Sequence, residues 1–85
     1  MDRSLYSEKY QALRKWLKAE RQKQEGLTLR VLAGRLGIHH SIVGKIEQGE
    51  RKLDVMEFVE YCEALGVDPV AGIRLIVSGA RKRSK

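Results

Sequence analysis

The chain has 85 residues and one cysteine, which limits it to a single small domain without an internal disulfide. A domain of this size has a thin core, so neither a deep catalytic cavity nor a second, ligand-sensing domain is expected. The formal net charge of +6 suits a polyanionic partner, although solubility alone would also account for it.

Apolar residues recur every three or four positions along most of the chain, which predicts an all-α fold of five helices. The first expected helix covers residues 4–24 and ends before Gly26. One stripe of this helix faces the core and is formed by Tyr6, Tyr10, Leu13 and Leu17, with Trp16 at its edge.

The second expected helix begins after Thr28, a good N-cap, and runs to Leu36. Gly37 follows, where a left-handed turn can end the helix, and Ile38 is expected to point inward. The third helix, over residues 40–48, starts only three or four residues later. So short a connection forces the two helices to cross steeply.

Val43 and Ile46 are expected on the inner face of the third helix. The fourth helix follows Asp54, another good N-cap. It runs to residue 65, and its expected inner residues are Val55, Phe58, Val59, Cys62 and Leu65. The fifth helix starts at the Asp68-Pro69 pair. The domain is expected to cover residues 1–79, before a basic, disordered tail of residues 80–85.

Four residues of the second and third expected helices and of the turn between them meet the steric requirements of a helix-turn-helix, and their spacing fits a single alignment of that motif. Ala33 is small where the two helices cross, and Gly37 stands where the turn needs a positive φ. Val43 and Ile46 anchor the third helix in the core. A generic helical bundle would meet some of these requirements, whereas this spacing meets them all.

Three segments carry a family resemblance: LAGRLGI, IEQGERKLDV and EALGVDP, at residues 32–38, 46–55 and 63–69. Together with their surroundings in residues 13–77, they resemble the XRE, or phage-repressor-like, helix-turn-helix family, to which lambda repressor and Cro belong. The resemblance implies a five-helix lambda-repressor-like domain. It also implies that the third helix enters the DNA major groove and that dimers bind palindromic operators. Leu29 and His39 depart from the family's usual glutamine and its usual Ser or Thr cap.

The outward face of the third helix holds the candidate base-reading residues: His40, Ser41, Gly44 and Lys45. His40 and Ser41 can donate or accept hydrogen bonds, and Lys45 can reach guanine or a phosphate. Gly44 costs the helix about 1 kcal/mol relative to alanine, which close approach to DNA would offset. The alternatives are a glycine tolerated on a surface and histidines that are exposed without a role.

Candidate contacts to the DNA backbone lie at both ends of the motif: Thr28, Arg30, His39, Arg51 and Lys52. Such contacts fix the register of the protein and make its affinity salt-dependent. Arg51 and Lys52 could instead belong to an ordinary solvated loop. Glu47 would repel phosphate in the groove, so it is expected to pair locally with an Arg or Lys.

The candidate dimer interface is formed by Val70, Ile73, Ile76 and Val77, which suit the intrachain core equally well. A two-fold dimer would double the DNA contacts and match a palindrome. Residues 54–79 carry one Arg and five Asp or Glu, a net charge of −4. We therefore expect the acidic stripe of the fourth helix, formed by Glu57, Glu60 and Glu63, to point away from DNA.

These features predict a cytoplasmic, sequence-specific regulator of transcription that binds double-stranded DNA as a homodimer and acts as a repressor. An antitoxin or a restriction–modification controller would use the same fold, and a protein-interaction module that has lost DNA binding is a further alternative. A protein partner that regulates the chain also stays open. No cofactor, metal or enzymatic activity is expected, because two adjacent histidines form neither a metal site nor a catalytic set. No membrane partner is expected, because apolar runs such as Leu75–Val77 are too short to span a bilayer.

Overall fold

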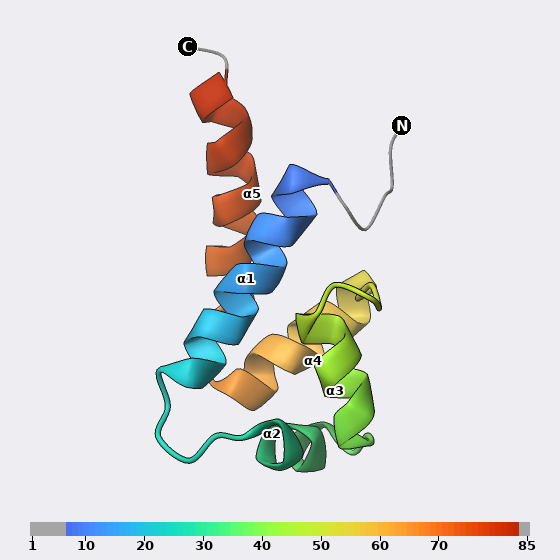
Figure 1. Ribbon diagram of the computed structural model, residues 1–85. Helices are drawn as coiled ribbons and strands as arrows, with labels where there is room; N and C mark the ends of the chain where they lie inside the picture. The colour runs from blue at the N-terminus through green and yellow to red at the C-terminus, as the bar shows by residue number, and fades with distance from the viewer. Residues whose placement is uncertain (1–6, 84–85) are drawn as a thin grey trace.

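The computed structural model describes residues 7–83, with side chains described up to Ser78. This part of the chain forms five helices and no strand, which confirms the expected all-α fold (Figure 1). The helices are α1 (Glu8–Gln22), α2 (Leu29–Leu36), α3 (His40–Glu47), α4 (Val55–Leu65) and α5 (Pro69–Arg83).

Side chains that accept backbone N–H groups start the helices where the sequence predicts. Thr28 accepts the N–H of Val31 at 3.2 Å. Asp54 accepts the N–H of Glu57 at 2.8 Å, and the Glu57 carboxylate accepts the N–H of Asp54 at 3.0 Å. This reciprocal pair is a capping box, so α4 begins at a fixed residue.

The predicted left-handed turn ends α2. Gly37 has a φ of 70°, and the N–H of Ile38 bonds to the carbonyl of Ala33 at 3.0 Å. Only residues 37–39 separate α2 from α3, and the two helices pack against each other, with α2 seen nearly end-on beside an upright α3 (Figure 1). This pair is the helix-turn-helix.

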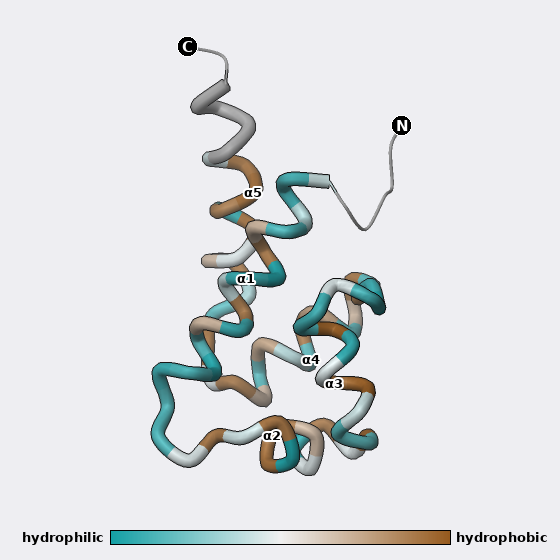
Figure 2. The backbone as a smooth tube through the Cα atoms, in the orientation of Figure 1, coloured by the Kyte–Doolittle hydropathy of each residue, from teal (hydrophilic) through white to brown (hydrophobic). Residues whose placement is uncertain are grey.

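One core joins all the helices, and α5 lies alongside α1 at the opposite end of the molecule from α2 (Figure 1). Figure 2 shows hydrophobic stretches on α2, α3 and α4, whereas the connection from α1 to α2 is hydrophilic in its first part and hydrophobic shortly before α2. Among the described residues, the buried core comprises Leu13, Leu17, Leu27, Leu32, Ala33, Val43, Ile46, Phe58, Tyr61, Cys62 and Leu65.

The structure corrects several expectations about which residues are inside. Val55 is 78% exposed because it lies in the first turn of α4, beyond the edge of the core. Tyr61, which the sequence reading left out, is 1% exposed and fills the middle of the inner face of α4. Ile38 is 37% exposed rather than fully inward.

The limits of the terminal helices also differ from the expected ones. Ser7 caps α1, which begins at Glu8 and ends at Gln22, inside the expected range of 4–24. Residues 1–6, including Tyr6, lie outside the described part of the chain. The structure continues α5 to Arg83, so the helix includes residues 80–83 of the expected tail, while residues 84–85 lie outside the described part of the chain.

Gly72 permits the close approach of α5 to the rest of the core. A Cβ atom on Gly72 would lie 2.8 Å from the Trp16 ring, 2.9 Å from the Phe58 ring and 3.0 Å from a methyl of Leu13. Such distances are too short for carbon atoms, so glycine is required here by packing. This packing fixes α5 against α1 and α4.

Candidate nucleic-acid interface

His39 is the N-cap of α3, as its position in the sequence suggested. Its Nδ1 accepts the N–H of Ser41 at 3.2 Å and lies 2.8 Å from the Ser41 hydroxyl oxygen. The ring of His39 stacks on that of His40, with centroids 4.3 Å apart. The two histidines therefore form an ordered start to the helix, although neither is the usual Ser or Thr.

The inner and outer faces of α3 differ sharply. Val43 and Ile46 are buried in the core, as predicted. On the opposite face Ser41 and Lys45 are exposed, and His40 and Gly44 are half-buried. The structure thus brings the four predicted base-reading residues onto one outward face, at the edge of the molecule (Figure 1).

Gly44 has no role in packing within the monomer. Its backbone is helical without a positive φ, and an added Cβ would meet no atom within 4 Å. Alanine would therefore fit and would favour the helix by about 1 kcal/mol. Nothing within the fold of the monomer requires a glycine here.

A buried ion pair fixes the C-terminal end of α3 to α1. Glu47 is 6% exposed, and its two carboxylate oxygens accept from Arg21 at 2.6 and 3.1 Å. Arg21 also donates to the carbonyl of Leu27 at 2.9 Å, and Arg14 donates to the carbonyl of Glu47. Such a bidentate pair holds α3 at a defined orientation.

Glu47 was expected to pair with a nearby cation, and the expectation of a local partner is wrong. Arg21 lies on a different helix, 26 positions earlier in the chain. The hydrogen bond to Glu47 raises the pKa of Arg21, while burial opposes the rise. One signal existed in the sequence, since Arg14 and Arg21 lie seven residues apart, on the side of α1 that carries Leu13 and Leu17.

The loop after α3 is held by Tyr10 and by an ion pair. The Tyr10 hydroxyl accepts the N–H of Leu53 at 3.2 Å and donates to the carbonyl of Arg51 at 3.5 Å. The Arg51 guanidinium lies 3.0 Å from the Glu57 carboxylate. Hydrogen bonds from the Asp54 backbone and from Arg51 lower the pKa of Glu57. Glu57 is thus occupied within the fold rather than part of a free acidic stripe.

The start of α2 presents polar groups next to this face. Thr28 and Arg30 are exposed, whereas Leu29 is half-buried against the core. The departure at Leu29 therefore serves packing. Partial burial of the ring lowers the pKa of His40, and electrostatic interaction with Arg30 and then with His39 lowers it further. Arg30 is thus close enough to His40 to influence its charge.

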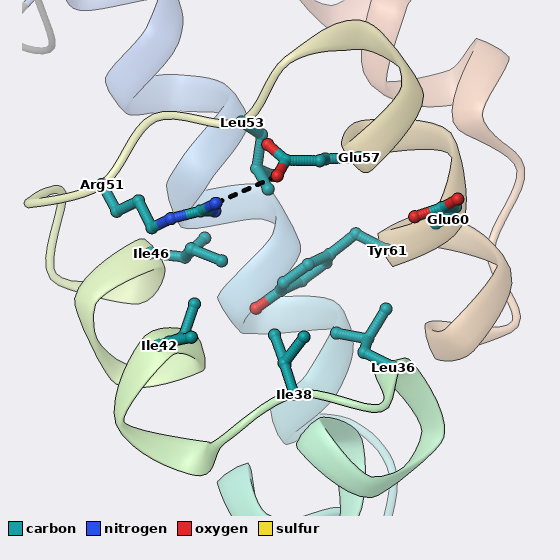
Figure 3. Close-up of a pocket in the computed structure, with 9 residues that line it drawn as sticks. All are labelled: Leu36, Ile38, Ile42, Ile46, Arg51, Leu53, Glu57, Glu60 and Tyr61. Atoms are coloured by element: carbon teal, nitrogen blue, oxygen red, sulfur yellow. Dashed lines mark hydrogen bonds and ion pairs between the residues drawn. The ribbon is translucent and has the colours of Figure 1, made fainter.

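A small apolar depression of about 100 Å³ lies beside the helix-turn-helix (Figure 3). The turn residue Ile38 lines it, which explains why this side chain is neither buried nor fully exposed. Figure 3 shows the Tyr61 ring across its floor and the Arg51–Glu57 pair at its rim. The Tyr61 hydroxyl is buried, without a hydrogen-bond partner among the described residues. Burial raises the pKa of this hydroxyl.

The four residues of the candidate dimer interface separate into two groups. Ile76 packs against the core of its own chain. Val70, Ile73 and Val77 are 49%, 48% and 49% exposed and lie at helical spacing on one side of α5. These three residues form the α5 stripe.

Among the described residues, no group of three His, Cys, Asp or Glu side chains is arranged to hold a metal ion. None of the helices in the same part of the chain is long and apolar enough to cross a membrane.

Comparisons with known proteins agree with this geometry. A family model described as helix-turn-helix matches residues 17–71. The solved structure of an XRE-family-like protein from Pseudomonas syringae pv. tomato is 41% identical in sequence, with a TM-score of 0.76. The match covers 82% of this chain and 84% of that one. No match was found among curated proteins.

The molecule is therefore a helix-turn-helix protein by both fold and sequence. The chain belongs to the XRE family, whose helix-turn-helix domain is a DNA-binding regulator fold.

Proposed function

We propose that the chain is a transcriptional repressor that binds specific double-stranded DNA through the outward face of α3. The main support for this proposal is that Val43, Ile46 and Glu47 are buried on the inner side of α3, while the outer side of the helix is accessible. His40, Ser41 and Lys45 are the base-reading residues of this proposal. Gly44 lets the helix approach the groove wall closely.

Contacts to the DNA backbone come from both ends of the motif in this proposal. Thr28, Arg30 and His39 flank the outward face of α3 on one side, and Lys52 is exposed on the other. Arg51 contributes less than its charge suggests, because Glu57 already pairs with it at 3.0 Å. Affinity is then expected to fall steeply with salt, since released counterions supply much of the binding free energy.

The α5 stripe is the surface through which we propose that two chains form a dimer. Val70, Ile73 and Val77 remain exposed after the monomer has folded, and burying them would remove apolar area from water. A two-fold axis at α5 would present two copies of α3 to a palindromic operator. Sedimentation of the Ile73→Glu variant, compared with the unmodified chain, tests this part separately.

The central experiment is selection from random duplexes, followed by titration of the selected site. We expect a palindromic site from which Lys45→Ala and His40→Ala each lose discrimination between sequences. Lys18→Ala removes the same charge from an exposed position on α1 and is the matched control. It should leave discrimination unchanged.

Two outcomes would contradict the proposal. Uniform weakening across all sequences in the Lys45 and His40 variants would assign these residues to phosphate rather than to bases. Failure to bind any duplex at low salt would favour a protein-interaction module that has kept the fold without DNA binding.

A further inference from the structure

The hydrogen bonds at the start of α3 determine where His39 carries its proton. A backbone N–H can only donate, and the N–H of Ser41 points to Nδ1 of His39 at 3.2 Å. Nδ1 is therefore unprotonated. A neutral imidazole then carries its hydrogen on Nε2, which faces away from the cap.

The same argument determines the direction of the bond between the two side chains. The Ser41 oxygen lies 2.8 Å from Nδ1 of His39, a distance that requires a proton between the two atoms. Nδ1 has none, so the Ser41 hydroxyl donates its own. Its only hydrogen is then used inside the protein, and its lone pairs are what the exposed side chain offers to a ligand.

We propose that His39 makes Ser41 a hydrogen-bond acceptor, and that Ser41 thereby selects a base with a major-groove amino group. The bases with such a group are adenine, through N6, and cytosine, through N4. Guanine and thymine offer only acceptors at the corresponding edge. They would leave the hydroxyl lone pairs dehydrated and without a partner. This inference rests on the proposed function, because it assumes that α3 enters the groove.

The cap residue makes this selectivity possible. A serine free to rotate its hydroxyl can donate to guanine or accept from adenine, and so discriminates little. Stacking on His40, at 4.3 Å between centroids, holds the His39 ring in the orientation in which Nδ1 accepts the hydrogen bond from the Ser41 hydroxyl. His39 is thus a positioning residue, and its exposed Nε2–H remains available as a donor to a phosphate.

The first test is spectroscopic and needs no DNA. Long-range ¹H–¹⁵N spectra of the free protein near pH 8 should show the Nε2–H tautomer of His39. The Nδ1–H tautomer would overturn the proposal without affecting the proposed function.

The second test uses the selected operator and base analogues that lack only the amino group. Ser41→Ala should identify one position in each half-site where preference disappears, and the unmodified chain should prefer adenine or cytosine there. Replacing that base by purine or 2-pyrimidinone removes the hydrogen bond to Ser41 and also one Watson–Crick hydrogen bond of the duplex. The Ser41→Ala variant lacks the first bond, so it reports the effect on the duplex alone. Binding of the unmodified chain should weaken roughly three- to tenfold more than binding of this variant.

The role of His39 is tested by His39→Gly, because glycine is accepted at an N-cap at a cost of only a few tenths of a kcal/mol. In this variant the Ser41 hydroxyl is free to rotate. The base preference should weaken at the base pair that Ser41 contacts, while the base pair that Lys45 contacts keeps its preference. Unchanged preference in His39→Gly, or selection of guanine or thymine at the Ser41 position, would overturn the inference although DNA binding is retained. Loss of all specific binding by the unmodified chain would instead defeat the proposed function.

Discussion

Gly44 of α3 and Gly72 of α5 both lie inside helices, and these two glycines have opposite surroundings. A methyl group on Gly72 of α5 would enter the space occupied by Trp16, Phe58 and Leu13, at 2.8 to 3.0 Å. A methyl group on Gly44 of α3 would meet nothing within 4 Å. Both positions lower the intrinsic stability of their helices. Only Gly72 is compensated by packing within the monomer.

The difference shows where each helix is constrained. The inner face of α5 is limited by the core, so its sequence follows from the fold. The inner face of α3 is fixed as well, by Val43, Ile46 and the buried Glu47, whereas its outer face costs stability without any gain inside the chain. This cost agrees with the proposed role of α3. Gly34 of α2 carries the same cost without a proposed DNA contact, so the two positions can be compared.

The ion pair at the end of α3 should give the largest effect on stability. Glu47→Ala leaves Arg21 partly buried without its carboxylate partner, and we expect the free energy of unfolding to fall by about 3 kcal/mol. Urea denaturation followed by circular dichroism measures this value. Glu63→Ala, which removes an exposed carboxylate from α4, is the control and should change it by less than about 0.5 kcal/mol. A loss below 1 kcal/mol in Glu47→Ala would show that the inner side of α3 is not held by this pair.

Gly72→Ala should be the next largest change. The added methyl must displace two aromatic rings or shift α5, at a cost of about 1–3 kcal/mol that exceeds the gain in helix propensity. The midpoint of thermal unfolding should therefore fall. A higher midpoint would mean that α5 can move away from α1 freely, and the contrast with Gly44 would disappear.

Gly44→Ala should have the opposite sign. Since the methyl enters open space, the variant should be more stable by about 1 kcal/mol. If the glycine serves close approach to DNA, the same variant should bind its operator more weakly. Gly34→Ala in α2 is the matched control, because its methyl also meets nothing within 4 Å and our proposal gives Gly34 no DNA contact. It should gain similar stability and keep its affinity. If Gly44→Ala and Gly34→Ala bind the operator with equal affinity, Gly44 is only a glycine tolerated on a surface.

Sequence alone was sufficient for the features that depend on neighbouring residues. Thr28 and Asp54 cap their helices and Gly37 takes the left-handed turn, because caps and turns are set within a few positions. The burial of Val43 and Ile46 follows from helical period, and so does the outward placement of the residues between them. The apolar spacing and the caps gave the order of the five helices, and the family resemblance supplied their arrangement.

Features that depend on distant residues could not be assigned from sequence, although the two arginines on the core side of α1 were a partial signal. The pairing of Arg21 with Glu47 requires knowing that α1 crosses the end of α3. The need for Gly72 depends on two aromatic rings from other helices. Val55 fits the helical spacing of the core residues, yet it lies one turn beyond the edge of the core. The spacing of apolar residues does not show where the core ends.

The smallest expected effect concerns the charge of His40 at the start of α3, where the outer face is most polar. Its pKa is lowered by partial burial and then by Arg30 and His39, so NMR titration of the free protein should give a midpoint below the ordinary 6.5. Since the folded chain then binds the proton less well than the unfolded chain, this contribution to stability is complete above about pH 6.5. It is lost as the pH falls through the lowered pKa of His40.

Arg30→Gln removes one cause and should raise the midpoint of His40 toward 6.5. Arg35→Gln is the control, because the Arg35 guanidinium donates to the carbonyl of Ala64 at 2.8 Å, at the end of α4. It should leave the titration of His40 unchanged. A midpoint above 6.5 in the unmodified chain would contradict the prediction. It would also favour a cationic His40 that contacts phosphate over a neutral ring that accepts from a base.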